Sequence, residues 1–169
     1  MSSSLTLTSM HDAVDWRLGS QLLASAAVGM HGGLAVLVVV DPHVKTGITA
    51  GDGGAVIWPL LVGVNKAKYM LMTGDLATAD EAMAMGLVNK VVDEGEALTE
   101  ATAIARRLAN GAPFAVQSSK IAVNKYIKAV SNLVLPLSPS LEEVSMTKAD
   151  HGEAVRAFQE KREPKFTGR

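Results

Sequence analysis

The stretch from Thr73 to Val88, TGDLATADEAMAMGLV, decides which fold we expect for this chain. Within it, Thr78 is followed three residues later by Glu81, the pattern of a capping box, in which each side chain bonds the other residue's backbone N–H at a helix start. Gly86 comes after the apolar positions and is typical of a helix C-terminus. The stretch therefore predicts a short helix from Thr78 to Met85 that stops at Gly86.

Outward from this stretch, the pattern is mainly helical. The apolar residues after Gly86 predict one short strand at 87–92, and helical periodicity then returns. Pro136 and Pro139 mark a break, after which Ser140 is expected to cap a helix. We therefore expect helices at 65–72, 97–109, from Pro113 through 129, after Ser140, and at 150–161.

Residues 41–54, DPHVKTGITAGDGG, precede the stretch 73–88. Pro42 and Gly47 break helical structure, and the glycines at its end open into the apolar segment 55–62. Asp52 is therefore expected near the start of a helix.

The first 40 residues give weaker signals. Helical spacing suggests a short helix at 11–23, and the run 34–40 after Gly32-Gly33 favours a buried strand. The apolar stretch 22–40 is too interrupted for a confident membrane span, and residues 1–8 lack the basic start of a secretory signal. We expect a cytoplasmic protein.

Composition narrows the function classes. The chain has 169 residues, 48% of them apolar, which suits a single globular unit. Its net charge of −1 gives no field that would attract nucleic acid. The absence of cysteine excludes disulfides, thiolate zinc sites and a cysteine nucleophile.

Three segments together resemble a known family. Residues 73–88 match the pattern T-G-x-x-x-x-A-x-E-A-x-x-x-G-L-V of the crotonase (enoyl-CoA hydratase/isomerase) superfamily. Residues 41–54 look like its glycine-rich turn, and residues 150–166 like its closing helix. The resemblance covers about Asp41 to Arg169, the C-terminal part of a crotonase.

This resemblance implies an α/β, crotonase-like (ClpP/crotonase) fold with a truncated β-β-α core and a helical C-terminal region. It divides the chain into a partial core at 1–92, of which 1–28 is unmatched, and a helical oligomerisation region at 93–169. A homotrimer or homohexamer is implied as well.

The resemblance also implies an oxyanion hole, in which two backbone N–H groups hold a thioester oxygen as an enolate forms. The Gly32-Gly33 turn matches one donor position, with Gly32 as the donor; the alternative is that these glycines only permit a tight turn. The family's alanine-glycine-acid motif, which supplies the other donor, has no match in 1–28, and a strand usual before Asp41 is absent. A genuine short protein, a deletion and a piece of a longer protein all stay open.

The two family glutamates that hydrate the substrate fall on Ala35 and His43, so the usual acid–base pair is replaced. Asp52 follows His43 by nine residues, and an aspartate can orient an imidazole and stabilise its cation. This spacing, with Trp58-Pro59 beyond it, resembles 6-oxocamphor hydrolase, a crotonase member that cleaves carbon–carbon bonds in β-diketones. The resemblance implies that His43 activates water with support from Asp52, and that Trp58 lies near the substrate.

Each of these residues has a plainer interpretation. A loop histidine is commonly a surface residue, and an aspartate between glycines commonly caps a helix. Lys161, Lys165 and Phe166 would contact coenzyme A by family resemblance, or belong to an ordinary solvated tail. No metal or redox cofactor is implied, and coenzyme A enters only as part of a thioester substrate.

Three functions therefore stay in view. The first is an acyl-CoA-handling enzyme of the enoyl-CoA hydratase/isomerase type with a His/Asp pair. The second is a hydrolase of carbon–carbon bonds, and the third a catalytically inactive assembly subunit.

Overall fold

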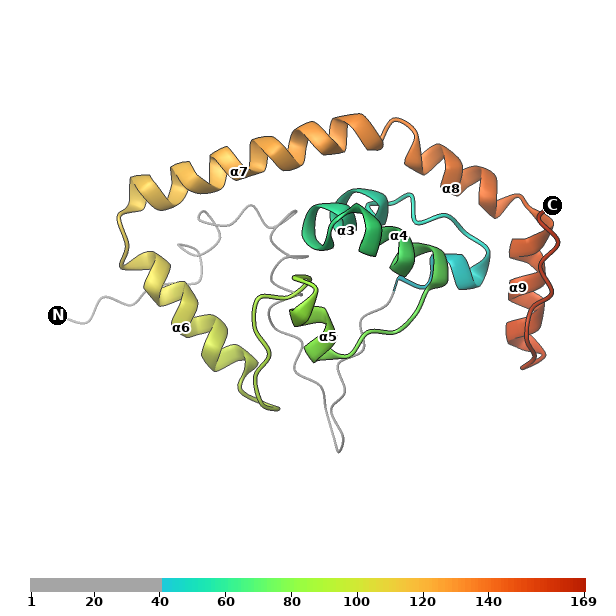
Figure 1. The fold of residues 1–169 in the computed structure, drawn as a ribbon, viewed down its shortest axis with the longest axis horizontal. Helices are drawn as coiled ribbons and strands as arrows, with labels where there is room; N and C mark the ends of the chain where they lie inside the picture. The colour runs from blue at the N-terminus through green and yellow to red at the C-terminus, as the bar shows by residue number, and fades with distance from the viewer. Residues whose placement is uncertain (1–40) are drawn as a thin grey trace.

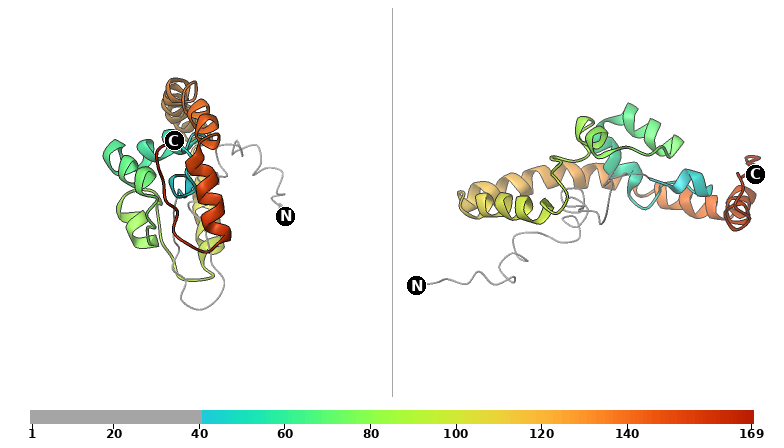
Figure 2. Two further views of the ribbon diagram at one scale, coloured as in Figure 1. Left: turned by 90° about the vertical axis from the view of Figure 1, so that its right-hand side faces the viewer. Right: turned by 90° about the horizontal axis from the view of Figure 1, so that it is seen from below.

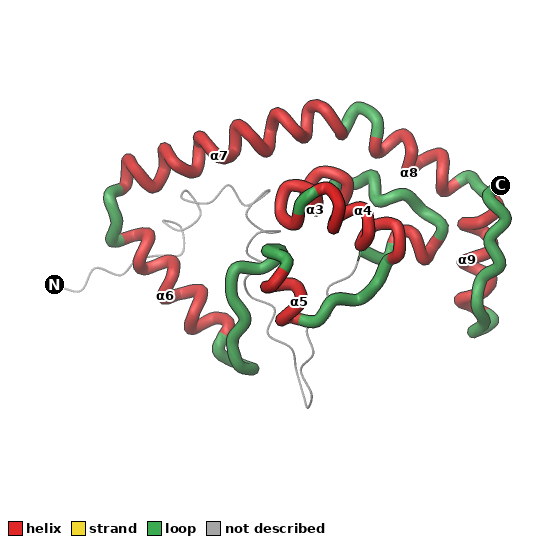
Figure 3. The backbone as a smooth tube through the Cα atoms, in the orientation of Figure 1, coloured by secondary structure: helices red, strands yellow, loops and turns green. Residues whose placement is uncertain are grey.

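The computed structural model describes residues 41–169, and these residues form helices joined by loops (Figures 1 and 3). The expected helix at 11–23, the strand at 34–40 and the Gly32-Gly33 turn lie outside the described residues. The β part of the predicted α/β fold therefore falls mainly on residues whose structure is not described.

The described elements begin with a one-turn 3-10 helix and continue with α-helices of very different lengths. In chain order they are η1 (His43–Thr46), α3 (Gly54–Val62), α4 (Val64–Thr73), α5 (Ala79–Ala84), α6 (Ala97–Ala109), α7 (Pro113–Val134), α8 (Ser138–Met146) and α9 (Ala149–Gln159).

The helices α6 to α9 form an open arch, with α7 along its long side and α6 and α9 at its two ends (Figure 1). Helices α3, α4 and α5 stand to one side of this arch (Figure 2). Helix α3 contacts both α4 and α7, so the arch is joined to the smaller helices near its middle.

A compact hydrophobic core lies among α3, α4, α5 and the loop after α5. Its buried members are one indole and smaller apolar side chains: Trp58, Ala67, Met70, Ala77, Ala82, Leu87 and Val88. Ala82 is fully buried and Ala67 is 1% exposed, so both alanines lie where the core is closely packed. The core thus explains Ala82, an alanine of the family pattern, as a close-packing position.

The capping box predicted at the start of α5 is confirmed. The Thr78 hydroxyl accepts the Glu81 backbone N–H at 3.3 Å, and the Glu81 carboxylate accepts the Thr78 N–H at 2.8 Å. Helix α5 ends at Ala84, and Gly86 follows with a φ of +83°, which favours glycine. Sequence-local rules therefore fix both ends of this helix.

The strand predicted at 87–92 is wrong, and the structure has no strand among the residues it describes. A strand needs a neighbouring strand to pair its backbone. The Leu87 and Val88 N–H groups instead donate to the Ala82 carbonyl, at 2.9 and 3.4 Å, while both side chains enter the core. The apolar run thus completes the end of α5.

The later helices agree with the sequence prediction except at two points. Helix α6 has the predicted bounds, whereas α7 continues beyond 129 to Val134, just before the residue that precedes Pro136. The expected Ser140 cap is wrong, because α8 begins at Ser138 with Pro139 in its first turn, where proline is favoured. Among the described residues, no helix is long and apolar enough to cross a membrane.

Candidate active site

His43 opens the 3-10 helix η1, and the backbone around it is closed by short hydrogen bonds. The Lys45 and Thr46 N–H groups donate to the Pro42 carbonyl, and the Ile48 N–H donates to the His43 carbonyl at 2.9 Å. Gly47 ends the turn with a φ of +71°. These local bonds fix the backbone that carries the His43 side chain.

Asp41 is the closest partner of the His43 ring. Its Oδ1 lies 2.6 Å from His43 Nδ1 and 3.4 Å from the His43 backbone N. The Asp41 side chain is only 10% exposed and that of His43 is 25% exposed. A charge-assisted bond that is shielded from water holds the imidazole more firmly than an exposed one would.

Asp52 stands on the other side of the imidazole. Its Oδ2 lies 3.8 Å from His43 Nε2, and its side chain is 63% exposed. The turn thus brings His43 and Asp52 together as the sequence spacing indicated, although beyond hydrogen-bond distance. The plainer interpretation of Asp52 as a helix cap is wrong, because Gly53 is the N-cap of α3 and no side chain bonds the helix start.

The carboxylates around His43 raise the pKa of its imidazole above 6.5. Partial burial lowers this pKa, but the hydrogen bond and charge of Asp41, with the charges of Asp52 and Glu142, outweigh that effect. The imidazolium form is therefore stabilised in the folded protein, and the neutral ring is a stronger base than a free histidine.

Helix α8 packs against the glycine-rich turn that carries Asp52. The Ser138 hydroxyl donates to the Gly51 carbonyl at 2.9 Å, and the Thr49 N–H donates to Ser145 Oγ at 3.0 Å. Glu142 lies between these two serines on α8 and contributes its charge to the His43 site. No local sequence pattern links Glu142 to His43, because the two residues lie far apart in the chain.

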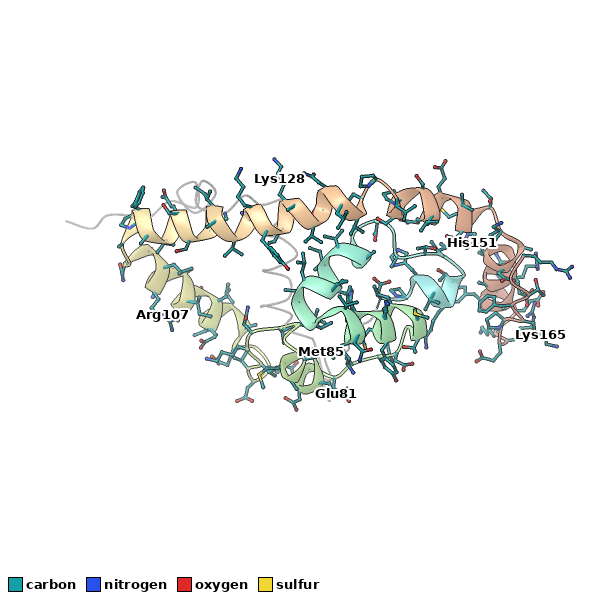
Figure 4. All side chains as sticks on the ribbon, turned by 45° about the horizontal axis from the view of Figure 1, so that its top comes forward. Glu81, Met85, Arg107, Lys128, His151 and Lys165 are labelled. Carbon is teal, nitrogen blue, oxygen red and sulfur yellow. The ribbon has the colours of Figure 1, made fainter. Side chains whose placement is uncertain are left out.

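Helix α9 contacts η1 from a second direction. The His151 Nδ1–H donates to the Thr46 carbonyl at 2.9 Å. A Cβ on Gly47 would come within 3.0 Å of the His151 backbone N, so glycine allows α9 to approach this closely. Figure 4 shows His151 at the end of the arch where α8 leads into α9.

The C-terminal tail folds back along α9. The Asp150 carboxylate accepts the N–H groups of Thr167 and Gly168 at 2.7 and 2.8 Å, and Glu153 accepts that of Lys165 at 3.0 Å. The coenzyme A contacts predicted from resemblance lie here: Lys161, Lys165 and Phe166, with Phe166 46% exposed. Figure 4 labels Lys165 on this tail, and the predicted role of these three residues stays a prediction.

Trp58 is 7% exposed and packs in the core described above. Its packing role is therefore clear, whereas its predicted place beside a substrate stays a prediction. The predicted oxyanion residues Gly32 and Gly33 lie outside the described residues.

A separate hollow of about 690 Å³ lies where η1, α4 and α5 meet. Its lining mixes charges with an aromatic ring: Lys66 sits 5.0 Å from the centre of the Tyr69 ring, and the Tyr69 hydroxyl donates to Asp75 at 2.7 Å. Glu81, which Figure 4 labels, also lines it but is engaged in the capping box. Asp75 and Glu81 are thus bonded to Tyr69 and Thr78, and we place the chemistry at His43 instead. Within 41–169, no group of three acidic or histidine residues could hold a metal ion.

Comparison with known proteins defines the class to which this helical arrangement belongs. The model of the enoyl-CoA hydratase/isomerase family matches residues 37–169. The chain is similar to a crotonyl-CoA hydratase from Syntrophomonas wolfei, with 38% identity over 126 residues, 75% of this chain and 48% of that protein. The chain therefore belongs to the enoyl-CoA hydratase/isomerase family, within the crotonase superfamily.

Two solved structures support the fold. An enoyl-CoA hydratase/isomerase from Pseudoalteromonas atlantica aligns with a TM-score of 0.70 and 27% identity, covering 77% of this chain and 52% of that one. A β-diketone hydrolase from Anabaena aligns with a TM-score of 0.61 and 30% identity, covering 65% and 44%. The predicted crotonase fold is confirmed.

The chain spans about half the length of the curated relatives it matches, 48% and 47% for the first two.

Proposed function

We propose that this chain belongs to an acyl-CoA-handling enzyme of the enoyl-CoA hydratase/isomerase type, in which His43 exchanges a proton with water or substrate. The observation that supports this is the position of the His43 ring, with a carboxylate beside each of its two nitrogens. These carboxylates raise the pKa of the imidazole above its usual value, so its neutral form is a stronger base.

In a hydration, His43 removes a proton from water, and the water oxygen bonds to the β-carbon of the enoyl thioester. The electron pair of the double bond moves to the thioester oxygen as an enolate, and the α-carbon then takes a proton from the imidazolium. One histidine is sufficient for both transfers, because the proton it gains is the proton it gives back. Backbone donors around the enolate oxygen, of which Gly32 is our candidate, would lower the barrier further.

A second candidate is hydrolysis of a carbon–carbon bond in a β-diketone. It is favoured by the replacement of the glutamate pair by His43 and Asp52, and by the similarity to the Anabaena β-diketone hydrolase. Here the water oxygen would bond to a carbonyl carbon, the bond to the neighbouring carbon would break, and that carbon would leave as an enolate and take the proton from His43.

The test compares two substrates with the full chain and its His43→Ala variant. We expect the chain to hydrate crotonyl-CoA and the variant to lose this activity while it remains folded, because a partly exposed side chain leaves no large cavity. Cleavage of a β-diketone without hydration would favour the second candidate. Equal activity of the variant would overturn the role of His43 in both.

The hypothesis of an inactive assembly subunit leads to a different expectation. Such a chain would turn over neither substrate. Acyl-CoA would leave its melting temperature unchanged, whereas a ligand that binds the folded state raises the melting temperature.

We further propose that the chain assembles as a homotrimer or homohexamer. Helices α6 and α7 contain no buried residue within the described part of the chain, and large apolar side chains on them are exposed, including Leu98, Leu108, Phe114, Tyr126 and Leu133. Such surfaces are typical of subunit interfaces. Sedimentation equilibrium would give three or six times the chain mass, and a monomer at micromolar concentration would contradict this assembly.

A further inference from the structure

Asp41 and Asp52 occupy different environments on the two sides of one imidazole. Asp41 is nearly buried and within hydrogen-bond distance of Nδ1, whereas Asp52 is mostly exposed and too far from Nε2 for a direct bond. Two carboxylates in such different positions are expected to have different roles.

We propose that Asp41, rather than Asp52, is the positioning residue of the His43 site: it holds the hydrogen on Nδ1, so that Nε2 is the nitrogen that exchanges protons. This assignment rests on the proposed function only for its catalytic meaning, because the state of the ring can be measured without a substrate.

The hydrogen-bonding chemistry fixes the ring state. An ionised carboxylate only accepts hydrogen bonds, so a 2.6 Å contact between Asp41 Oδ1 and Nδ1 requires the hydrogen to be on Nδ1. In the neutral ring, Nε2 then has the free electron pair. This nitrogen faces the exposed side, where Asp52 lies 3.8 Å away.

The backbone holds Asp41 in place from two directions. Pro42 separates it from His43, with a φ of −85° and a ψ of 0°, and its carbonyl accepts the bonds that close η1. On the other side, Gly54 begins α3, and a Cβ there would come within 2.5 Å of Asp41 Oδ2. The positive end of the α3 dipole also favours a carboxylate beside that helix start. Asp41 is therefore fixed in a way that the exposed Asp52 is not.

Within residues 41–169, the charged groups that act on His43 come from three places. Asp41 precedes it, Asp52 follows on the glycine-rich turn, and Glu142 reaches it from α8. All three favour the imidazolium. Of these three carboxylates, only Asp41 bonds the ring directly, so only its removal is expected to change which nitrogen holds the proton in the neutral form.

The experiment is nitrogen NMR of the full chain with labelled histidine, with His43 assigned by the loss of its signals in His43→Gln. At a pH above the His43 pKa, we expect the form with hydrogen on Nδ1 to predominate in the wild type. Predominance of the form with hydrogen on Nε2 would overturn the proposal without any variant.

Asp41→Asn and Asp52→Asn are the matched variants. We expect both to move the His43 titration to lower pH, and only Asp41→Asn to weaken the preference for hydrogen on Nδ1. Asp41→Glu, which keeps the charge, should recover part of that preference, and it serves as the second variant if Asp41→Asn does not fold. An unchanged tautomer in Asp41→Asn, or an equal change in Asp52→Asn, would contradict the assignment.

If the chain turns over a substrate, Asp41→Asn should lower kcat by about 100-fold with a smaller change in KM, since orientation acts on the proton-transfer step. The acid limb of the variant's pH–rate profile should also move to lower pH. If no substrate is turned over, the proposed function fails while the NMR result still decides the role of Asp41.

Discussion

The Ser138 hydroxyl donates a buried hydrogen bond to the Gly51 carbonyl, 2.9 Å away, and this bond joins the start of α8 to the turn that carries Asp52. The two residues are 87 positions apart in the chain. Because η1 and this turn hold the candidate catalytic groups, their geometry depends on α8 and α9 packing correctly from the C-terminal end.

The Gly51 contact leads to a first prediction, Gly51→Ala. A Cβ at this position would overlap the Ser138 carbonyl oxygen, a backbone atom that cannot move away easily. We expect the free energy of unfolding to fall by about 1–3 kcal/mol, as measured by urea denaturation.

Gly152→Ala is the matched control for that change. Gly152 lies within α9, and a Cβ there would meet only the flexible end of Arg156 at 3.5 Å. Alanine is the better helix former, so this variant should gain up to about 1 kcal/mol. Equal losses in both variants would show that the Gly51 contact has no special role.

Thr78→Ala tests the capping box of α5. It leaves an N–H group of the first turn without its side-chain partner, and we expect a loss of about 1 kcal/mol in the free energy of unfolding. The control is Thr102→Ala, because the Thr102 hydroxyl only donates to the Leu98 carbonyl within α6. Thr102→Ala should change the free energy of unfolding by less than about 0.5 kcal/mol. If Thr102→Ala lost more stability than Thr78→Ala, the cap would not be the cause of the loss.

Glu153 should make the attachment of the C-terminal tail sensitive to acid. Hydrogen bonds from Arg162 and from the Lys165 N–H lower the pKa of this carboxyl from 4.5 to about 2. A lowered folded pKa gives stability that is present above pH 4.5 and lost as the pH falls toward about 2.

We therefore expect limited proteolysis of residues 162–169 to accelerate over that acid range in the wild type. Glu153→Gln should be cleaved readily at every pH, while Glu143→Gln on the exposed side of α8 should behave as the wild type. Identical cleavage of all three proteins would mean that Glu153 does not hold the tail.

His43 should affect stability in the opposite direction. Its folded pKa lies above 6.5, so protonation stabilises the fold, fully below pH 6.5 and less as the pH rises through the folded value. The free energy of unfolding should decline over this neutral to basic range, and His43→Gln should remove that part of the decline. A variant with the same pH dependence as the wild type would place the effect on another group.

Much of the local structure followed from short-range rules. The capping box, the glycine after α5 and the bounds of α6 depend on residues a few positions apart, so the sequence was sufficient to predict them. The strand expected at 87–92 failed because pairing requires a second strand, and the apolar side chains entered the helical core instead. Ser140 failed as a cap because Pro139 favoured an earlier start of α8.

The sequence by itself determined the family and the meeting of His43 with Asp52, because the motif glycines and alanines and the short turn act through neighbouring residues. Only the tertiary structure decided that Asp41 bonds the imidazole, since this requires the bend at Pro42 and the close approach of α3 at Gly54. The contribution of Glu142 from α8 likewise depends on the buried contact between Ser138 and Gly51. Contacts between residues far apart in the chain are set by how helices pack, and no local pattern encodes them.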